Sequence, residues 1–213
     1  MKYPVCVKIL SIVFFFAILI FANLYEHISP SYSVENDSVI VCEEKYIFTQ
    51  TNWRCGQTGK RIGFIEDAPQ FGKFLYLLFP HGLYEIADDE GRYFYQIKEI
   101  GSSKNYALLV RADISLNMPV EGEIMSVICN EKEFTDPTVI HELFCLLASS
   151  EYESPVGSLR MGYLKIYSSQ YPGIYYQVDW YQDEDQQYFL APFEAEYGQY
   201  VQVPNELSKI IWS

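Results

Sequence analysis

The sequence is poor in basic residues. Its 213 residues include 15 lysines and arginines against 28 aspartates and glutamates, which gives a net charge of −13 at neutral pH. A protein that binds nucleic acid or an anionic lipid surface needs positive charge to approach the phosphates. The composition therefore argues against both kinds of partner, while it allows a basic protein partner. Net charge of this size also keeps a protein soluble without any role in binding.

The chain also lacks the short motifs of common enzymes. It has no Gly-x-Ser-x-Gly elbow, no Cys-x-x-Cys pair and no second histidine that would turn His141-Glu142 into a zinc-protease signature. The glycines at positions 56 and 59 are too close together for a phosphate-binding loop, and we interpret residues 56–61 as a hairpin turn. We therefore expect a protein that is not an enzyme, with no metal and no cofactor.

Acidic residues are absent from the first 25 positions, where the sequence instead contains a long apolar run. Residues 9–24 carry no charge, and Lys2 and Lys8 precede them. About 20 apolar residues span a bilayer, and residues 5–25 are long enough. Because lysines stay on the cytoplasmic side, we expect a single-pass membrane protein whose C-terminal domain is extracytoplasmic, and periplasmic in a bacterium. A cleaved signal peptide is the alternative, although Ala22 is a poor cleavage site.

Only five cysteines are present. Cys6 precedes the apolar run, and the other four lie in the part expected outside the cytoplasm. An even number of cysteines in an oxidising compartment predicts disulfides. We favour the local pairs Cys42–Cys55 and Cys129–Cys145, each of which would stabilise the fold by about 3 kcal/mol. The two other pairings of these four residues stay open.

Cys145 lies four residues after His141 on a predicted helix, so the two side chains can meet. A disulfide from Cys145 to Cys129 explains this position. An inert thiol and a reactive pair, with the cysteine as nucleophile and the histidine as its base, are the alternatives.

Beyond the apolar run, the pattern is mostly that of β-strands. Ile40, Cys42, Tyr46 and Phe48 are expected on one face of a first strand, and residues 74–79 form an apolar run of strand length. An antiparallel meander is predicted from about residue 62 to residue 112, with an acidic turn at 88–91 that we interpret as solvated. Further strands are expected at 159–167, 174–181, 187–191 and 200–203.

Two helices are predicted. Asp136 can cap a helix over about 137–149, and Pro137 suits its first position. A short helix is expected at 205–212. These helices and a mainly antiparallel sheet predict an α+β fold after a single transmembrane helix. The expected organisation is a transmembrane signal anchor at 1–25, a polar spacer at 26–37 and an extracytoplasmic α+β domain at 38–213, with an internal seam at 150–158.

Tyrosine is the residue type in clearest excess, with 19 copies. On one face of the predicted strand at 174–181 lie Tyr175, Gln177, Asp179 and Tyr181. Aromatic rings beside hydrogen-bonding groups are typical of surfaces that bind proteins or sugars. Tyrosine is also an ordinary strand residue. We take these four residues as a hypothetical binding site.

The leading hypothesis is a membrane-anchored, extracytoplasmic binding protein that neutralises or scaffolds a basic protein partner, as an immunity-like protein or an envelope-complex subunit. The anchor, the negative charge and the lack of catalytic motifs motivate it. The alternative is an envelope domain that binds or hydrolyses carbohydrate. A domain that assembles with copies of itself is a third hypothesis.

Overall fold

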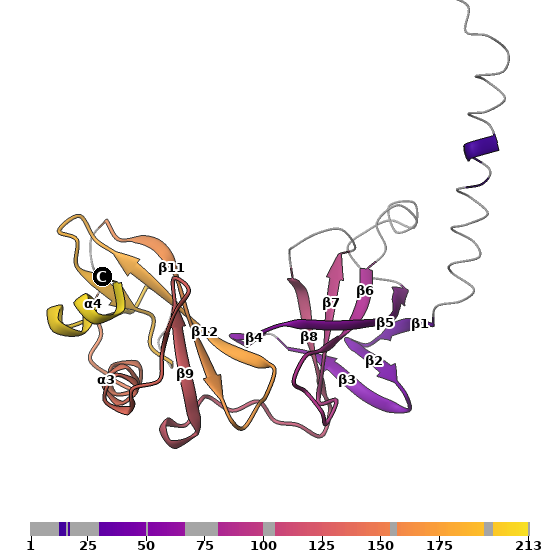
Figure 1. Cartoon of the computed structure of the whole chain (residues 1–213), viewed down its shortest axis with the longest axis horizontal. Coiled ribbons are helices and arrows are strands. Elements are labelled where there is room, and N and C mark those ends of the chain that lie inside the picture. The colour runs from indigo at the N-terminus through magenta and orange to yellow at the C-terminus, as the bar shows by residue number, and fades with distance from the viewer. Residues whose placement is uncertain are drawn as a thin grey trace, which may run out of the picture.

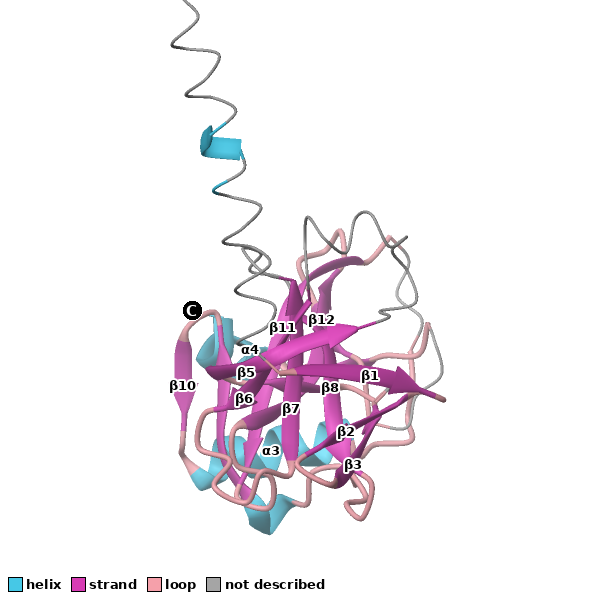
Figure 2. Ribbon diagram, turned by 90° about the vertical axis from the view of Figure 1, so that its right-hand side faces the viewer, coloured by secondary structure: helices cyan, strands magenta, loops and turns pink. Residues whose placement is uncertain are grey.

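The chain from residue 30 onward forms two β-sheet units that lie side by side (Figure 1). The computed structural model describes residues 13–15, 17, 30–49, 51–66, 81–99, 105–153, 157–193 and 198–212. One unit is a closed barrel and the other is an open sheet with helices on one side. Figures 1 and 2 show these helices, α3 (Pro137–Leu147) and α4 (Asn205–Trp212), at the end of the second unit that is farther from the barrel.

The barrel has seven strands in the order β1-β2-β3-β8-β7-β6-β5. They are β1 (Ser31–Glu35), β2 (Ser38–Val41), β3 (Glu44–Phe48), β5 (Thr58–Glu66), β6 (His81–Ile86), β7 (Phe94–Glu99) and β8 (Asn105–Arg111). Neighbouring strands are antiparallel except β1 and β5, whose parallel pairing closes the barrel. Closure leaves no strand edge of the barrel unpaired.

Eight buried side chains form the barrel core: Val39, Val41, Tyr46, Ile65, Leu83, Tyr95, Ile97 and Leu109. The rings of Tyr46 and Tyr95 pack edge to face, with their centroids 4.8 Å apart. The Tyr46 hydroxyl donates a hydrogen bond to the carbonyl oxygen of Arg92 at 2.7 Å. This buried polar group therefore has the partner that an interior hydroxyl needs.

The second sheet has the strand order β10-β9-β11-β12-β13-β14, and β4 also pairs with β12. The remaining elements are β4 (Trp53–Cys55), η1 (Glu121–Glu123), β9 (Ile124–Cys129), β10 (Lys132–Phe134), β11 (Leu159–Ser168), β12 (Ile174–Gln182), β13 (Tyr188–Leu190) and β14 (Val201–Gln202). In the sequence β4 lies between two barrel strands, yet it pairs with β12. The barrel segment thus contributes a strand to the second sheet.

A second buried cluster, the shared core, runs from α3 and α4 across the inner face of the second sheet to the outside of the barrel. Trp53 of β4 packs edge to face on both Tyr171 and Tyr176. The Trp53 indole N–H donates to the carbonyl oxygen of Asn117 at 3.1 Å. Phe94, on the outside of the barrel, packs edge to face on Tyr171. The two units are therefore joined by packing as well as by strand pairing.

The structure confirms both predicted helices. α3 begins at Pro137, and the Asp136 carboxylate accepts a hydrogen bond from the Thr138 amide at 2.8 Å. α4 has the predicted bounds. The meander is confirmed too, because β5, β6, β7 and β8 pair consecutively and antiparallel. The strand expected at 74–79 lies outside the described residues.

The predicted α+β class is wrong. The fold is mostly β, with a closed seven-stranded barrel, and its described part from residue 30 onward contains three short helices. Alternation along a sequence predicts that a segment is extended, but it does not show which strand edges meet. The parallel pairing of β1 with β5, which makes the barrel, has no local sequence signal.

The first barrel strands also differ from the prediction. Residues 31–35, expected in a polar spacer, form β1. The strand expected over residues 40–48 turns back at Cys42 and Glu43, whose φ angles of 51° and 73° are those of a tight hairpin turn. This turn reverses the expected facing of Ile40 and Cys42, which are exposed, whereas Tyr46 and Phe48 face the barrel core as expected. Ile40 is 62% exposed, and the valines on either side of it enter the barrel core.

Two further expectations concern the membrane segment and the internal seam. The membrane-spanning segment at residues 5–25 falls outside the described residues, apart from 13–15 and 17. Within the described chain, no helix has the length and apolar character needed to cross a bilayer. The seam expected at 150–158 lies inside the second unit, where Glu153 forms a β-bridge with Tyr200.

Candidate functional site

The four residues of the hypothetical binding site lie on the outer face of the second sheet. Their neighbours on β12 pack into the shared core, so alternation turns these four side chains to the opposite side. Strand register adds residues of β4 and β11 to the same face. The resulting tyrosine face consists of Tyr163, Tyr167, Tyr175, Tyr181, Arg54, Arg160, Lys165, Gln177 and Asp179.

The carboxylate of the tyrosine face is already engaged. Asp179 Oδ1 accepts hydrogen bonds from Arg160 Nη2 and Gln177 Nε2, both at 2.9 Å. The face has three basic side chains, and register adds Glu133 of β10 as a second acid beside Asp179, so it does not carry the negative charge that a basic partner would seek. Asp179 therefore stabilises its own neighbours rather than presenting a free charge.

The central ring of the tyrosine face is largely covered. Tyr175 is 6% exposed, and Lys165 Nζ lies 5.3 Å from the centroid of its ring. Burial raises the pKa of Tyr175 to about 12. Tyr163, which was not among the four predicted residues, is 39% exposed. It is the ring of this face that a ligand can reach most easily.

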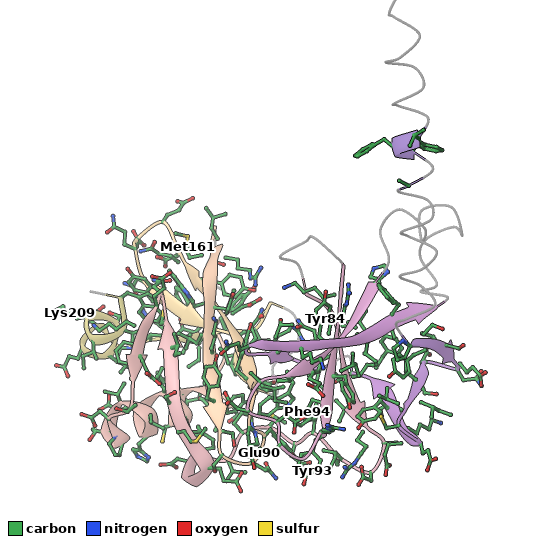
Figure 3. All side chains as sticks on the ribbon, turned by 45° about the vertical axis from the view of Figure 1, so that its right-hand side comes forward. Tyr84, Glu90, Tyr93, Phe94, Met161 and Lys209 are labelled. Carbon is green, nitrogen blue, oxygen red and sulfur yellow. The ribbon has the colours of Figure 1, made fainter. Side chains whose placement is uncertain are left out.

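A cavity of about 350 Å³ lies at the turn of the hairpin formed by β6 and β7. Its lining consists of Glu85, Ile86, Asp89, Glu90, Arg92, Phe94 and Tyr95. Figure 3 shows Glu90 and Phe94 close together at the lower edge of the molecule. Three carboxylates and one guanidinium line this hairpin cavity, so its electrostatic potential favours a cation.

Asp89 is the buried acid of the hairpin cavity, at 9% exposed. Its Oδ2 accepts a hydrogen bond from the Phe94 amide at 2.8 Å, which fastens the turn. Its Oδ1 has no hydrogen-bond partner among the described residues. Burial raises the pKa of this carboxyl above its usual value, because the charged form loses hydration. Three consecutive acids in the sequence do not show which one folds inward, so the sequence pattern missed this residue.

The structure forms neither of the expected disulfides, and all four described cysteines are unpaired. Cys55 and Cys129 are buried in the shared core, and burial raises the pKa of each thiol to about 11. Cys42 and Cys145 are exposed. Each expected pair thus joins a core residue to a surface residue, although the two are close in sequence.

Two residues near Cys145 could activate its thiol: His141, which contacts the sulfur, and Glu121, which contacts the ring of His141. Sγ is 3.7 Å from Nε2 of His141, and Nδ1 of the same ring is 2.7 Å from Oε1 of Glu121. The helical spacing predicts the first contact, whereas Glu121 lies in η1 and has no local signal. Within the described part of the chain, no three His, Cys, Asp or Glu side chains are placed to hold a metal ion.

No family model, curated protein or solved structure matches this chain. Its function is therefore argued from its own residues.

Proposed function

We propose that this protein binds a basic protein partner outside the cytoplasm, and that a lysine or arginine side chain of the partner enters the hairpin cavity. The observation that carries this proposal is the set of three carboxylates that line the hairpin cavity, among them the buried Asp89, whose Oδ1 accepts no hydrogen bond from the described residues although the Arg111 guanidinium acts on this carboxyl. A buried carboxylate is costly unless a cation or a hydrogen-bond donor meets it. The location rests on the apolar run at residues 9–24.

The remaining lining suits the same ligand. Ile86, Phe94 and Tyr95 offer apolar walls to the methylene groups of a long basic side chain. The volume of about 350 Å³ is large enough for one such side chain. The net charge of −13 would steer a basic partner toward the protein and raise its association rate at low salt.

Binding is tested by titrating the full chain, kept in mild detergent, with a basic peptide that carries one arginine between neutral residues. Asp89→Asn removes the charge but keeps an oxygen for the Phe94 amide. It should weaken binding at least about tenfold, because loss of one partner of a buried charge pair costs roughly 2–5 kcal/mol.

Asp88→Asn is the matched control for this variant. It removes the same charge from the neighbouring residue, which does not line the hairpin cavity. Asparagine also tolerates the φ of 68° at this position. Binding should change less than about twofold, as expected for a screened surface charge. Equal effects of the two variants would overturn the proposed site.

Glycan binding at the tyrosine face is the second candidate, favoured by the exposed ring of Tyr163 beside hydrogen-bond donors of the same face. A sugar ring would stack on Tyr163. Tyr163→Ala should then abolish retention on immobilised envelope glycan at both low and high salt, because stacking is not screened. Asp89→Asn should leave this retention unchanged. Full retention by Tyr163→Ala would remove the candidate.

A further inference from the structure

We propose that Cys145, His141 and Glu121 form a thiol–disulfide exchange site that takes a small-molecule disulfide as its substrate. The site lies on the exposed side of α3 and η1. It is separate from the hairpin cavity and from the tyrosine face, and it does not depend on the proposed binding function.

The three side chains are ordered as a nucleophile, its base and a group that orients the base. Sγ of Cys145 lies 3.7 Å from Nε2 and 4.0 Å from Nδ1 of His141. Oε1 of Glu121 lies 2.7 Å from Nδ1. A carboxylate at Nδ1 favours the ring form with its proton on that nitrogen. Nε2 is then the atom that accepts the thiol proton, and Glu121 is a positioning residue.

The positions of the other cysteines in the described chain keep their thiols away from Cys145. Cys145 is therefore expected to exchange with an external disulfide. Cys55 and Cys129 are buried in the shared core. Cys42 lies in the turn between β2 and β3, which Figure 1 places at the end of the molecule away from α3. An adduct on Cys145 would therefore persist rather than be displaced by an internal thiol. Exchange requires access to the sulfur, and Cys145 is exposed.

In the exchange step, the proton of the Cys145 thiol passes to Nε2 of His141, and Sγ attacks one sulfur of the substrate. A new S–S bond forms at Cys145 and the S–S bond of the substrate breaks. The second sulfur leaves as a thiolate and takes up the proton from His141 or from water. The substrate disulfide is itself the oxidant, so the step needs no other co-reactant.

Charged groups near the thiol determine the choice of probe. Besides His141, the two elements that form the site carry three acids, Glu121 and Glu123 in η1 and Glu142 in α3. These acids repel an anionic disulfide. The probe is therefore the neutral disulfide dithiodipyridine, whose released thiopyridone is followed by absorbance. Mass spectrometry of peptides then assigns the reaction to each cysteine of the full chain.

Cys145 should react about tenfold faster than Cys42 at neutral pH, which is less than the roughly 10²–10⁴-fold that a positioned base contributes in an enclosed active site, because this site is open to solvent. Cys42 is the internal control because it is also exposed. His141→Ala should lower the Cys145 rate to that of Cys42. Added imidazole should restore part of the rate.

Two glutamine variants separate the role of Glu121 from a general charge effect. Glu121→Gln should slow Cys145 about threefold, because the ring loses its orienting carboxylate. Glu142→Gln removes the same charge from the helix that carries the thiol and should leave the rate unchanged. A Cys145 rate no higher than that of Cys42, an unchanged rate in His141→Ala, or equal effects of the two glutamine variants would each overturn the proposal.

Discussion

The barrel and the second sheet bury their apolar side chains in different ways. The barrel closes on itself, and every residue of its core belongs to barrel strands. The second sheet is open, with one face covered by α3 and α4. Its shared core also includes Ile86, Phe94, Leu108 and Val110 from the outside of the barrel. Among the described residues, the barrel core contains none from the second sheet, whereas the second sheet packs on the outer surface of the barrel. We therefore expect the second sheet to depend on the barrel more than the barrel depends on it.

The positions of the tryptophans allow the unfolding of the second sheet to be followed separately from that of the whole chain. All three, Trp53, Trp180 and Trp212, belong to the second sheet or to the helix that covers it. The fluorescence of Trp180 and Trp212 therefore reports on the second sheet, and that of Trp53 reports on the junction between the units, while far-ultraviolet circular dichroism reports on both units. A variant that separates the two signals during denaturation would show directly which unit depends on the other.

The largest effect is expected from Trp53→Ala, which empties the centre of the shared core. A buried tryptophan replaced by alanine typically costs about 3–5 kcal/mol, because both transfer energy and packing are lost. The fluorescence of Trp180 and Trp212 should change at a lower denaturant concentration than in the native chain. A barrel transition seen by circular dichroism should stay close to its native midpoint.

Leu83→Ala is the reciprocal variant, since Leu83 belongs to the barrel core. Its expected cost is about 2–5 kcal/mol. If the dependence is one-sided, this change should lower the midpoints of both signals, because the second sheet loses the surface against which it packs. Two signals that stay coincident in both variants would mean that the units unfold as one.

A smaller effect, about 2 kcal/mol or more, is expected from Gly173→Ala. Gly173 has a φ of 82°, where an L side chain is strained, and a Cβ there would meet the carbonyl oxygen of Ala87 at the end of the β6–β7 hairpin. The substitution would therefore push the two units apart. Gly122→Ala is the control, because nothing lies within 4 Å of its added Cβ and its φ is not positive. Thermal unfolding should shift for Gly173→Ala only.

The same comparison shows what the sequence can predict. In the second sheet, α3 followed from Asp136 and Pro137, and β11 and β12 followed from alternation, but β9 and β10 were not predicted. In the barrel, the meander of β5 to β8 followed from local turn signals, whereas closure depends on pairings between distant residues. Neither the closure by β1 and β5 nor the departure of β4 to the second sheet has a local pattern.

At the candidate sites too, local patterns were predictable, whereas contacts between distant residues were not. The common face of Tyr175, Gln177, Asp179 and Tyr181 was predictable from a period of two residues. The burial of Tyr175 and the engagement of Asp179 were not, because they depend on Lys165 and Arg160 of the neighbouring strand. Asp89 was missed for a related reason, since the hairpin turn folds one of three consecutive acids inward.

The smallest expected effect concerns Asp89 and the pH dependence of stability. Because burial raises the pKa of this carboxyl, the folded chain holds a proton at Asp89 that the unfolded chain has released. The folded and unfolded chains differ in this proton at pH values between the ordinary carboxyl pKa of about 3.9 and the raised pKa of Asp89. Asp89 therefore stabilises the fold most below this window, and its contribution is lost as the pH rises through it.

Asp89→Asn has no titrating group at this position but keeps an acceptor for the Phe94 amide. The native chain should therefore lose stability relative to Asp89→Asn as the pH rises through the window. Relative to Asp88→Asn, its stability should not change in this way. A bound basic peptide would supply the charge that Oδ1 lacks, so saturating peptide should reduce the shift. A pH-independent difference would mean that the barrel tolerates an ionised Asp89 without a partner, and the reason for a cation to enter the hairpin cavity would be lost.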